Sequence, residues 1–335
     1  MHSYRPGQPA VQDNGTVRPS LAQSRSGDAR LGIGARHRLT RRGLLRTASG
    51  MAALIAANGV CGPLSWARTA AATASEDAPV SERQGTLRST RVWVDGVPFH
   101  TLVAADRVPA TAPAVVLVHG LGLSGRYMIP TAEALAPTHR VYVPDLPGFG
   151  DSGKPDRALD VPGLADALAT WIPAAGLERA MLLGNSFGCQ IIGDLAARDP
   201  ERVERAVLQG PTAPPDERSW LWQFIRWQQN SPYNPPEMGD IAQADYVKTG
   251  PVRLFLTFQF SLEDRLEDKL PRVRAPMLVV RGALDPICNQ EWGEFVARRL
   301  PRGRLVVIPD VAHTLVYTAA PELVAASLPF LQGAA

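Results

Sequence analysis

The chain has 335 residues and a formal net charge of +3 that is unevenly distributed. Residues 1–74 contain ten arginines, no lysine and two acidic residues, so the rest of the chain holds 25 basic and 30 acidic side chains. A mildly acidic body argues against nucleic acid as the main partner. Three cysteines are too few for a disulfide framework, and no residues have the spacing of a zinc site. We therefore expect a small-molecule substrate as partner and no metal.

The first 74 residues are typical of an export signal. Arg41 and Arg42 form a twin arginine ahead of an apolar stretch over residues 48–60, and small residues at 70–74 offer possible cleavage sites. This arrangement resembles a Tat signal peptide, which implies export by the Tat machinery of a bacterium to a periplasmic or extracellular location. A disordered basic arm is the alternative. Residues 75–87 are predicted to form a polar linker.

Short apolar segments alternate with amphipathic segments along most of the remaining chain. Two β-branched stretches over residues 88–94 and 97–104 flank Asp95-Gly96, which predicts a β-hairpin. The alternation that follows predicts an α/β protein, with a mostly parallel sheet covered by helices on both faces. Strands are expected at 114–118, 140–143, 180–183, 203–208, 277–280 and 304–308, and helices at 124–136, 159–175, 189–198, 290–300 and 320–331.

Residues 211–270 interrupt this alternation, and helix-like pieces near 241–248 and 252–262 follow a proline-rich segment. An insertion of this length predicts a helical cap over the carboxyl ends of the strands, where parallel sheets bind their ligands. The core is then expected to comprise residues 88–210 and 271–335. Four aromatic residues could line an apolar substrate pocket or equally form the cap's own core: Trp220, Trp222, Phe224 and Trp227.

The segment from Gly184 to Gly188 contains Gly-x-Ser-x-Gly between a predicted strand and a predicted helix. Such a junction is typical of a nucleophile elbow, which exposes a strained serine, here Ser186, at the carboxyl end of the sheet. The two glycines lack side chains, so strand and helix can approach each other closely. A glycine-rich turn with an incidental serine is the alternative.

A serine hydroxyl needs a histidine to accept its proton and a carboxylate to orient that histidine. Of the four histidines beyond residue 74, only His313 is both late in the chain and at the same end of the sheet as Ser186. Asp285 follows the strand predicted at 277–280, at that same end. The predicted triad is therefore Ser186, Asp285 and His313, with Asp310 as the rival acid.

Five motifs in order make residues 88–331 resemble the α/β-hydrolase superfamily: His119 to Gly122, Asp145 to Ser152, Gly184 to Gly188, Gly282 to Asp285, and Asp310 to His313. The resemblance implies an α/β-hydrolase fold without a cofactor, and an acyl-enzyme mechanism in which Ser186 attacks and His313 shuttles the proton. It also implies an oxyanion hole formed by the backbone N–H groups of Leu121 and Phe187. We expect hydrolysis of a small, largely apolar carboxylic ester.

Three alternative functions remain open from the sequence. Gly-Asn-Ser-x-Gly is similar to the elbow of meta-cleavage C–C hydrolases, but their tryptophan shortly after the histidine is absent here and Cys189 replaces their second glycine. Residues 120–125 match Gly-x-Gly-x-x-Gly, and Asp145 follows at the spacing of an NAD(P)-binding oxidoreductase. A binding protein with a hydrolase fold is the third alternative.

Overall fold

The computed structural model describes residues 83–84 and 86–333 of the chain. The export signal predicted over residues 1–74 lies outside the described residues, and so do residues 75–82 and 85 of the predicted linker. Within the described ranges, no helix is both long enough and apolar enough to cross a lipid bilayer.

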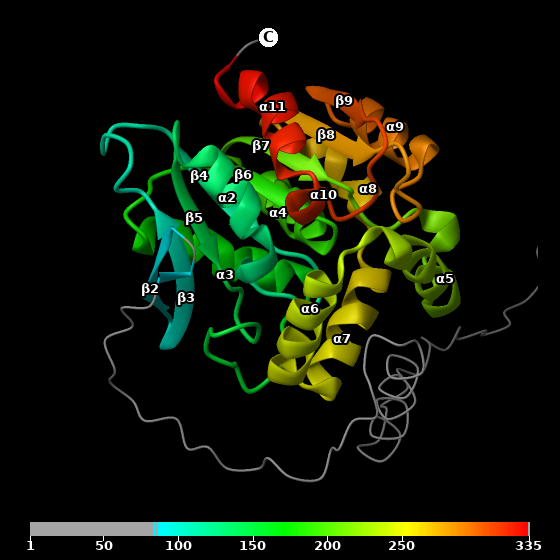
Figure 1. Cartoon of the computed structure of the whole chain (residues 1–335), viewed down its shortest axis with the longest axis horizontal. Helices are drawn as coiled ribbons and strands as arrows, with labels where there is room; N and C mark the ends of the chain where they lie inside the picture. The colour runs from blue at the N-terminus through cyan, green and yellow to red at the C-terminus, as the bar shows by residue number, and fades with distance from the viewer. Residues whose placement is uncertain (1–82, 85, 334–335) are drawn as a thin grey trace, which may run out of the picture. The chain divides into compact units, whose positions relative to one another are not determined.

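A nine-stranded sheet forms the centre of the described fold (Figure 1). Its strands are β1 (Arg83–Gln84), β2 (Leu87–Val94), β3 (Val97–Ala104), β4 (Ala114–Val118), β5 (Arg140–Pro144), β6 (Ala180–Asn185), β7 (Val203–Gln209), β8 (Met277–Gly282) and β9 (Gly303–Ile308). They follow the order β1-β2-β3-β5-β4-β6-β7-β8-β9. The pairs β1–β2, β2–β3 and β3–β5 are antiparallel and the other neighbours are parallel. The predicted fold class is confirmed.

The hairpin at the antiparallel side of the sheet is closed by Asp95 and Gly96, which both have positive φ, at 49° and 78°. Two successive residues of positive φ form the tight turn whose twist matches that of paired strands, and Asp-Gly favours it. Val94 consequently pairs with Val97, and the register continues along both strands. The hairpin predicted from this dipeptide is confirmed.

Helices cover both faces of the sheet. The longer ones are α2 (Ile129–Leu135), α3 (Val161–Ala174), α4 (Phe187–Arg198), α5 (Trp220–Asn230), α6 (Pro236–Thr249), α7 (Pro251–Glu263), α9 (Gln290–Arg299) and α11 (Ala320–Leu331). Short helical turns are η1 (Gly125–Met128), η2 (Pro200–Arg202), η3 (Pro215–Glu217), η4 (Ser231–Tyr233), α8 (Leu266–Lys269), η5 (Leu270–Arg272) and α10 (Leu315–Thr318). Capping side chains set several starts, as where Asp160 accepts a hydrogen bond from the amide of Gly163 at α3.

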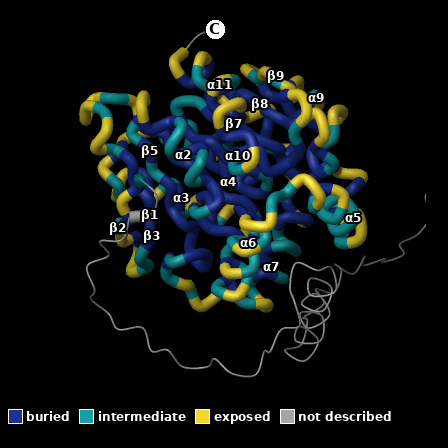
Figure 2. Tube along the Cα trace, viewed as in Figure 1, coloured by how far each residue is buried: buried dark blue, intermediate teal, exposed yellow. Residues whose placement is uncertain are grey.

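The side chains of β4 show how the two layers form. Val115 and Leu117 belong to the apolar cluster that contains α2, α10 and α11, whereas Val116 and Val118 belong to the cluster that contains α3, α4 and α9. Successive side chains of a strand point to opposite faces, so a strand buried on both faces is apolar throughout. Figure 2 shows the buried strands at the centre of the described fold, with exposed segments around its rim.

Residues 211–270, which we call the insertion, lie between β7 and β8 and contain α5, α6 and α7. Helices α6 and α7 lie side by side (Figure 1) and are separated by a single residue, Gly250, whose φ is 79°. The helix predicted at 252–262 agrees with α7 to within one residue at each end. The helix predicted at 241–248 is too short: α6 begins at Pro236, and proline is well tolerated in the first turn of a helix. Helix α5, capped by Ser219, was not predicted as a helix.

Candidate active site

Ser186 lies in the sharp turn between β6 and α4, with φ 56° and ψ −116°. Only residues held by their surroundings adopt such a strained backbone conformation. A Cβ atom at Gly188 would lie 2.3 Å from the carbonyl oxygen of Val118, and one at Gly184 would lie 2.9 Å from the backbone carbonyl carbon of Gly188. The elbow geometry therefore requires glycine at both positions, for the reason that the sequence suggested.

Asp285 and His313 form a direct side-chain contact. Nδ1 of His313 lies 2.9 Å from Oδ2 of Asp285, and both side chains are buried. The other carboxylate oxygen, Oδ1, accepts hydrogen bonds from the amides of Ile287 (2.8 Å) and Cys288 (2.9 Å). With Nδ1 engaged, Nε2 is the imidazole nitrogen left to exchange a proton, and it has no hydrogen-bond partner among the described residues. Asp310, the rival acid, is exposed in a turn after β9.

Ser186 and His313 line the same cavity, whose volume is about 1090 Å³. Leu121 and Phe187, the two residues expected to supply oxyanion donors, line it as well. Phe187 is the first residue of α4, where amides lack intrahelical partners and the helix dipole favours negative charge. Four of the predicted site residues, from three separate loops, thus meet at one cavity. Asp285 does not line this cavity, but it contacts His313, which does.

A chain of buried polar contacts, missed from the sequence, joins the loops around Ser186. The amide of Gly120 donates to the hydroxyl of Tyr127 (2.7 Å), which donates to Oδ1 of Asn185 (2.7 Å). Nδ2 of Asn185 donates to Oε1 of Gln209 (2.6 Å), and Nε2 of Gln209 donates to the carbonyl of His313 (2.9 Å). A polar residue that directly follows a buried apolar run, as Gln209 follows residues 206–208 at the end of β7, is the signal that could have found it.

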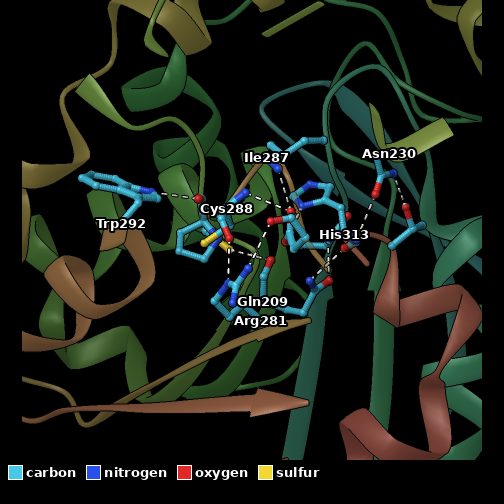
Figure 3. A network of polar contacts seen from close by, with 12 residues as sticks. Gln209, Asn230, Arg281, Ile287, Cys288, Trp292 and His313 are labelled. Carbon is cyan, nitrogen blue, oxygen red and sulfur yellow. Dashed lines mark hydrogen bonds and ion pairs between the residues drawn. The ribbon is translucent and has the colours of Figure 1, made fainter. Parts of the chain in front are cut away.

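Two further polar residues brace the loops of the acid and the histidine (Figure 3). Asn230, the last residue of α5, accepts a hydrogen bond from the amide of His313 at 3.0 Å. Arg281, at the end of β8, donates to the carbonyls of Cys288 (2.8 Å) and Asp285 (3.1 Å). Arg281 was detectable as a charged residue within an apolar strand, whereas nothing local distinguishes Asn230 in the sequence.

The predicted aromatic wall is present only in part. Trp220, Phe224 and Trp227 line the cavity, but Trp222 does not and is 45% exposed. The prediction for Trp222 is corrected by helix geometry, because residues two apart in a helix point in nearly opposite directions. Trp220 also stacks on Phe255 at 4.9 Å between ring centroids, so the aromatic residues form both the cavity wall and the packing within the insertion.

The charges around the cavity are few. Asp240 and His313 are its only lining residues of acidic or basic type, and no lysine or arginine lines it in the described part of the chain. Carboxylate and phosphate groups in proteins are usually bound by arginine or lysine. The cavity is therefore suited to a neutral, largely apolar ligand.

His119 has a structural environment. Its Nδ1 lies 2.9 Å from the carbonyl of Gly120, and its Nε2 accepts a hydrogen bond from the amide of Leu146. Burial lowers the pKa of His119, so the neutral form that these contacts require is favoured. The side chain fixes the start of the 120–124 loop to the loop after β5.

The side chain of Asp145 is fully used inside the protein, which removes support for dinucleotide binding at residues 120–125. It contacts Nδ1 of His100 (2.8 Å) and accepts from the amides of Gly125 (2.7 Å) and Asp151 (2.9 Å). In the dinucleotide interpretation this carboxylate would bind a ribose hydroxyl. One potential ligand atom from each of His100, Asp145 and Asp151 lies within 4.8 Å of the others, as in a metal site. Both ring nitrogens of His100 are already in contact with protein groups, because Nδ1 contacts Asp145 and Nε2 lies 2.7 Å from the hydroxyl of Ser89.

Both described cysteines are free and buried. The thiol of Cys189 donates to the carbonyls of Gly184 and Gln209, each at 3.3 Å, which fixes the elbow helix against β6 and β7. Burial raises the pKa of the thiols of Cys189 and Cys288, so neither is a reactive thiolate.

Comparison with known proteins identifies a family and several relatives. Residues 115–327 match the model of the alpha/beta hydrolase family. A pimeloyl-[acyl-carrier protein] methyl ester esterase of Vibrio campbellii is 26% identical over 227 residues, covering 60% of this chain and 87% of the relative. A 1-acylglycerol-3-phosphate O-acyltransferase of Arabidopsis thaliana is 34% identical over 122 residues, but the match spans only 34% of this chain and 29% of that relative.

Solved structures show the same fold. A thermophilic esterase of Thermogutta terrifontis superposes with a TM-score of 0.61 at 23% identity, covering 74% of this chain and 99% of that one. An enol-lactonase of Burkholderia xenovorans LB400 gives a TM-score of 0.63 at 21% identity, covering 72% and 100%. Since the family model covers most of the described residues and the elbow, the acid loop and the histidine loop are all in place, the chain belongs to the alpha/beta hydrolase family.

Proposed function

We propose that this protein is a serine hydrolase that cleaves a neutral, largely apolar carboxylic ester through an acyl-enzyme intermediate. The observation that carries the proposal is the convergence of Ser186 and His313 on one cavity, with Asp285 fixed on Nδ1 of His313. Ester cleavage by the Vibrio relative, as its name states, supports the reaction type. The comparisons agree with a hydrolytic enzyme that acts on esters.

The proposed reaction has two stages. The hydroxyl oxygen of Ser186 attacks the ester carbonyl carbon while Nε2 of His313 accepts the hydroxyl proton, and the carboxylate of Asp285 stabilises the imidazolium. The negative oxygen of the tetrahedral intermediate lies against the amides of Leu121 and Phe187. His313 then protonates the alcohol as the C–O bond breaks. In the second stage, water attacks the acyl carbon while His313 accepts a proton from it. As the bond to the Ser186 oxygen breaks, His313 returns this proton to that oxygen, and the acid is released.

The walls of the cavity favour a neutral substrate. Aromatic side chains from α5 and α7 supply much of the apolar surface, among them Trp220, Phe224 and Phe255. The absence of lysine and arginine from the described lining argues against substrates that carry a carboxylate, such as the ring-fission products of C–C hydrolases. Ester hydrolysis is therefore preferred over C–C cleavage.

The test is hydrolysis of p-nitrophenyl esters of increasing acyl length by the full chain, beside Ser186→Ala. We expect release of p-nitrophenol by the wild type and its loss in Ser186→Ala. A wild type that is folded but inactive toward the whole series would overturn the proposal. A charged competitor of equal length, the monoester of a dicarboxylic acid, should be a poorer substrate than its neutral counterpart.

We also propose that residues 1–74 direct export through the Tat machinery, on the basis of Arg41, Arg42 and the apolar stretch that follows them. The experiment is a fusion of residues 1–74 to a reporter in cells with and without a functional Tat system. Export should require Tat and should be lost when both arginines are replaced by lysine. Export that is independent of Tat, or no export, would reject the proposal.

A further inference from the structure

We propose that Asp245, on helix α6 of the insertion, is a positioning residue that holds the 120–124 loop in the geometry needed to stabilise the oxyanion. The proposal rests on the proposed function, because Leu121 in this loop is the expected oxyanion donor. Asp245 is fully buried and does not line the cavity, so its role would be exerted through the loop and not by contact with substrate.

The contact between Asp245 and the loop is direct and double. Oδ2 of Asp245 accepts a hydrogen bond from the amide of Ser124 at 2.8 Å and another from the hydroxyl of Ser124 at 2.7 Å. Both residues are 0% exposed, so the carboxylate replaces water for two donors at the end of the loop. Hydrogen bonds to a charged acceptor are about twice as strong as neutral ones.

Helix α6 holds the middle of the same loop as well. The hydroxyl of Thr249 donates to the carbonyl of Gly122 at 3.2 Å. Gly122 has φ +72°, and a Cβ atom there would lie 2.5 Å from Cδ1 of Leu254 and 2.9 Å from Cε1 of Tyr246. The insertion and the loop are therefore in contact at Gly122 and at Ser124.

Leu121 lies between the points at which the loop is fixed. On one side the amide of Gly120 is bonded to Tyr127, and on the other Gly122 and Ser124 are bonded to α6. The direction of the Leu121 N–H follows from the placement of these neighbours. An oxyanion donor displaced by about 1 Å can lose much of its effect on the rate, so the anchor at Ser124 should affect the transition state more than substrate binding.

The choice of an aspartate is also informative. Oδ1 of Asp245 has no hydrogen-bond partner among the described residues, although the side chain is buried. Burying a carboxylate with one unpaired oxygen is unfavourable for stability. The two strong bonds made by Oδ2 nevertheless favour an acid at this position, because they hold Ser124 at the end of the loop that is expected to stabilise the oxyanion.

The experiment compares Asp245→Ala, Asp245→Asn and Ser124→Ala with the wild type in the full chain. We expect Asp245→Ala to lower kcat about 10- to 100-fold while KM changes less than about threefold, because the loss is confined to the transition state. Asp245→Asn keeps an oxygen acceptor and should recover part of kcat. Ser124→Ala, which removes one of the two bonds, should have a smaller effect than Asp245→Ala.

A second measurement separates positioning from general stability. A trifluoromethyl ketone forms a tetrahedral adduct with an active serine, so its affinity reports the oxyanion site. We expect its affinity to fall in Asp245→Ala by a factor close to the fall in kcat. The matched control is Glu237→Ala, which removes an exposed acid from the same helix and should leave kcat, KM and inhibitor affinity unchanged.

The outcomes are distinguishable. An active wild type together with a folded Asp245→Ala that keeps wild-type kcat and inhibitor affinity would overturn the positioning role alone. A rise in KM and a lower melting temperature without loss of inhibitor affinity would overturn it too, since that pattern indicates support of the insertion only. If Asp245→Ala does not fold, Asp245→Asn and Ser124→Ala decide by the same criteria. A wild type inactive toward every ester would overturn the proposed function and this inference together.

Discussion

The amide of Gly120 and the carbonyl of His313 are joined by four hydrogen bonds that pass through the side chains of Tyr127, Asn185 and Gln209. Asn185 directly precedes Ser186 in the chain, so the same contacts fix the residue beside the elbow serine. A buried chain of polar side chains therefore fixes the position of the loop that is expected to stabilise the oxyanion relative to the loop that carries the histidine.

Gln209→Met should break this chain at its centre. Methionine has nearly the same length, but it leaves Nδ2 of Asn185 and the carbonyl of His313 without their buried partners. Each unpaired buried group costs about 1–3 kcal/mol, so the free energy of unfolding should fall by a few kcal/mol together with kcat. Denaturant unfolding and ester hydrolysis measure the two effects. A variant as stable and active as the wild type would show that the chain is dispensable.

Asp285→Asn and Asp310→Asn should differ sharply. Asp285 is the carboxylate in contact with Nδ1 of His313, whereas Asp310 is exposed. We expect kcat to fall about 10³- to 10⁴-fold in Asp285→Asn and to change less than about twofold in Asp310→Asn. Steady-state kinetics on one p-nitrophenyl ester compares the pair. The reverse order of effects would assign the acid to Asp310.

Asn230→Ala tests whether the insertion also positions the histidine. The substitution removes the acceptor of the His313 amide, and we expect a loss of about 10-fold in kcat with little change in KM. The neighbouring Gln229→Ala is the control, because Gln229 is exposed and makes no contact with His313. Equal kinetics for the two variants would contradict the assignment.

Asp245 predicts a specific dependence of stability on pH. Burial raises its pKa to about 6 from an ordinary value of 3.8. Because the folded state binds this proton more tightly than the unfolded state, its contribution to stability is largest below about pH 4 and is lost as the pH rises to about 6. At about 1.4 kcal/mol per pKa unit, the loss is at most about 3 kcal/mol. Urea unfolding of wild type and Asp245→Asn from pH 4 to 7 should show it only in the wild type, and identical curves would refute it.

Trp220→Ala and Trp222→Ala are a matched pair on one helix. Trp220 lines the cavity and packs on Phe255 and Phe258, whereas Trp222 points to solvent with the Arg226 guanidinium 5.6 Å from its ring. Trp220→Ala should therefore shift the preferred acyl length, and Trp222→Ala should not. A complete set of kcat/KM values along the ester series measures the shift. The same dependence on acyl length in both variants would show that Trp220 of α5 does not contact the acyl chain of the substrate.

The sequence was sufficient where local rules decide the structure. Asp95-Gly96 predicted the hairpin, and Gly-x-Ser-x-Gly between a buried strand and a helix predicted the strained turn at Ser186. The alternation of strands and helices predicted which loops reach the same end of the sheet. That was enough to predict that Asp285 and His313 lie near Ser186, because the carboxyl ends of parallel strands meet at one edge.

The sequence was insufficient where contacts join distant segments of the chain. Asn230 and Asp245 both lie in the insertion. Nothing near them in the sequence predicts that Asn230 contacts His313 or that Asp245 contacts Ser124. Helix α5 was missed, although Trp220, Phe224 and Trp227 recur at helical spacing. Its orientation then decided that Trp220 and not Trp222 reaches the cavity.

The contact between Gly122 and helix α6 has a consequence for protein engineering. Insertions between the same two strands are an obvious unit to exchange among members of one family when new specificity is wanted. Here Tyr246 and Leu254 occupy the space that any side chain at position 122 would need, and Asp245 completes the bonds of Ser124. A chimera that imports another insertion must therefore also import the 120–124 loop that matches this insertion. Otherwise the loop that carries Leu121 loses its contacts at Gly122 and Ser124.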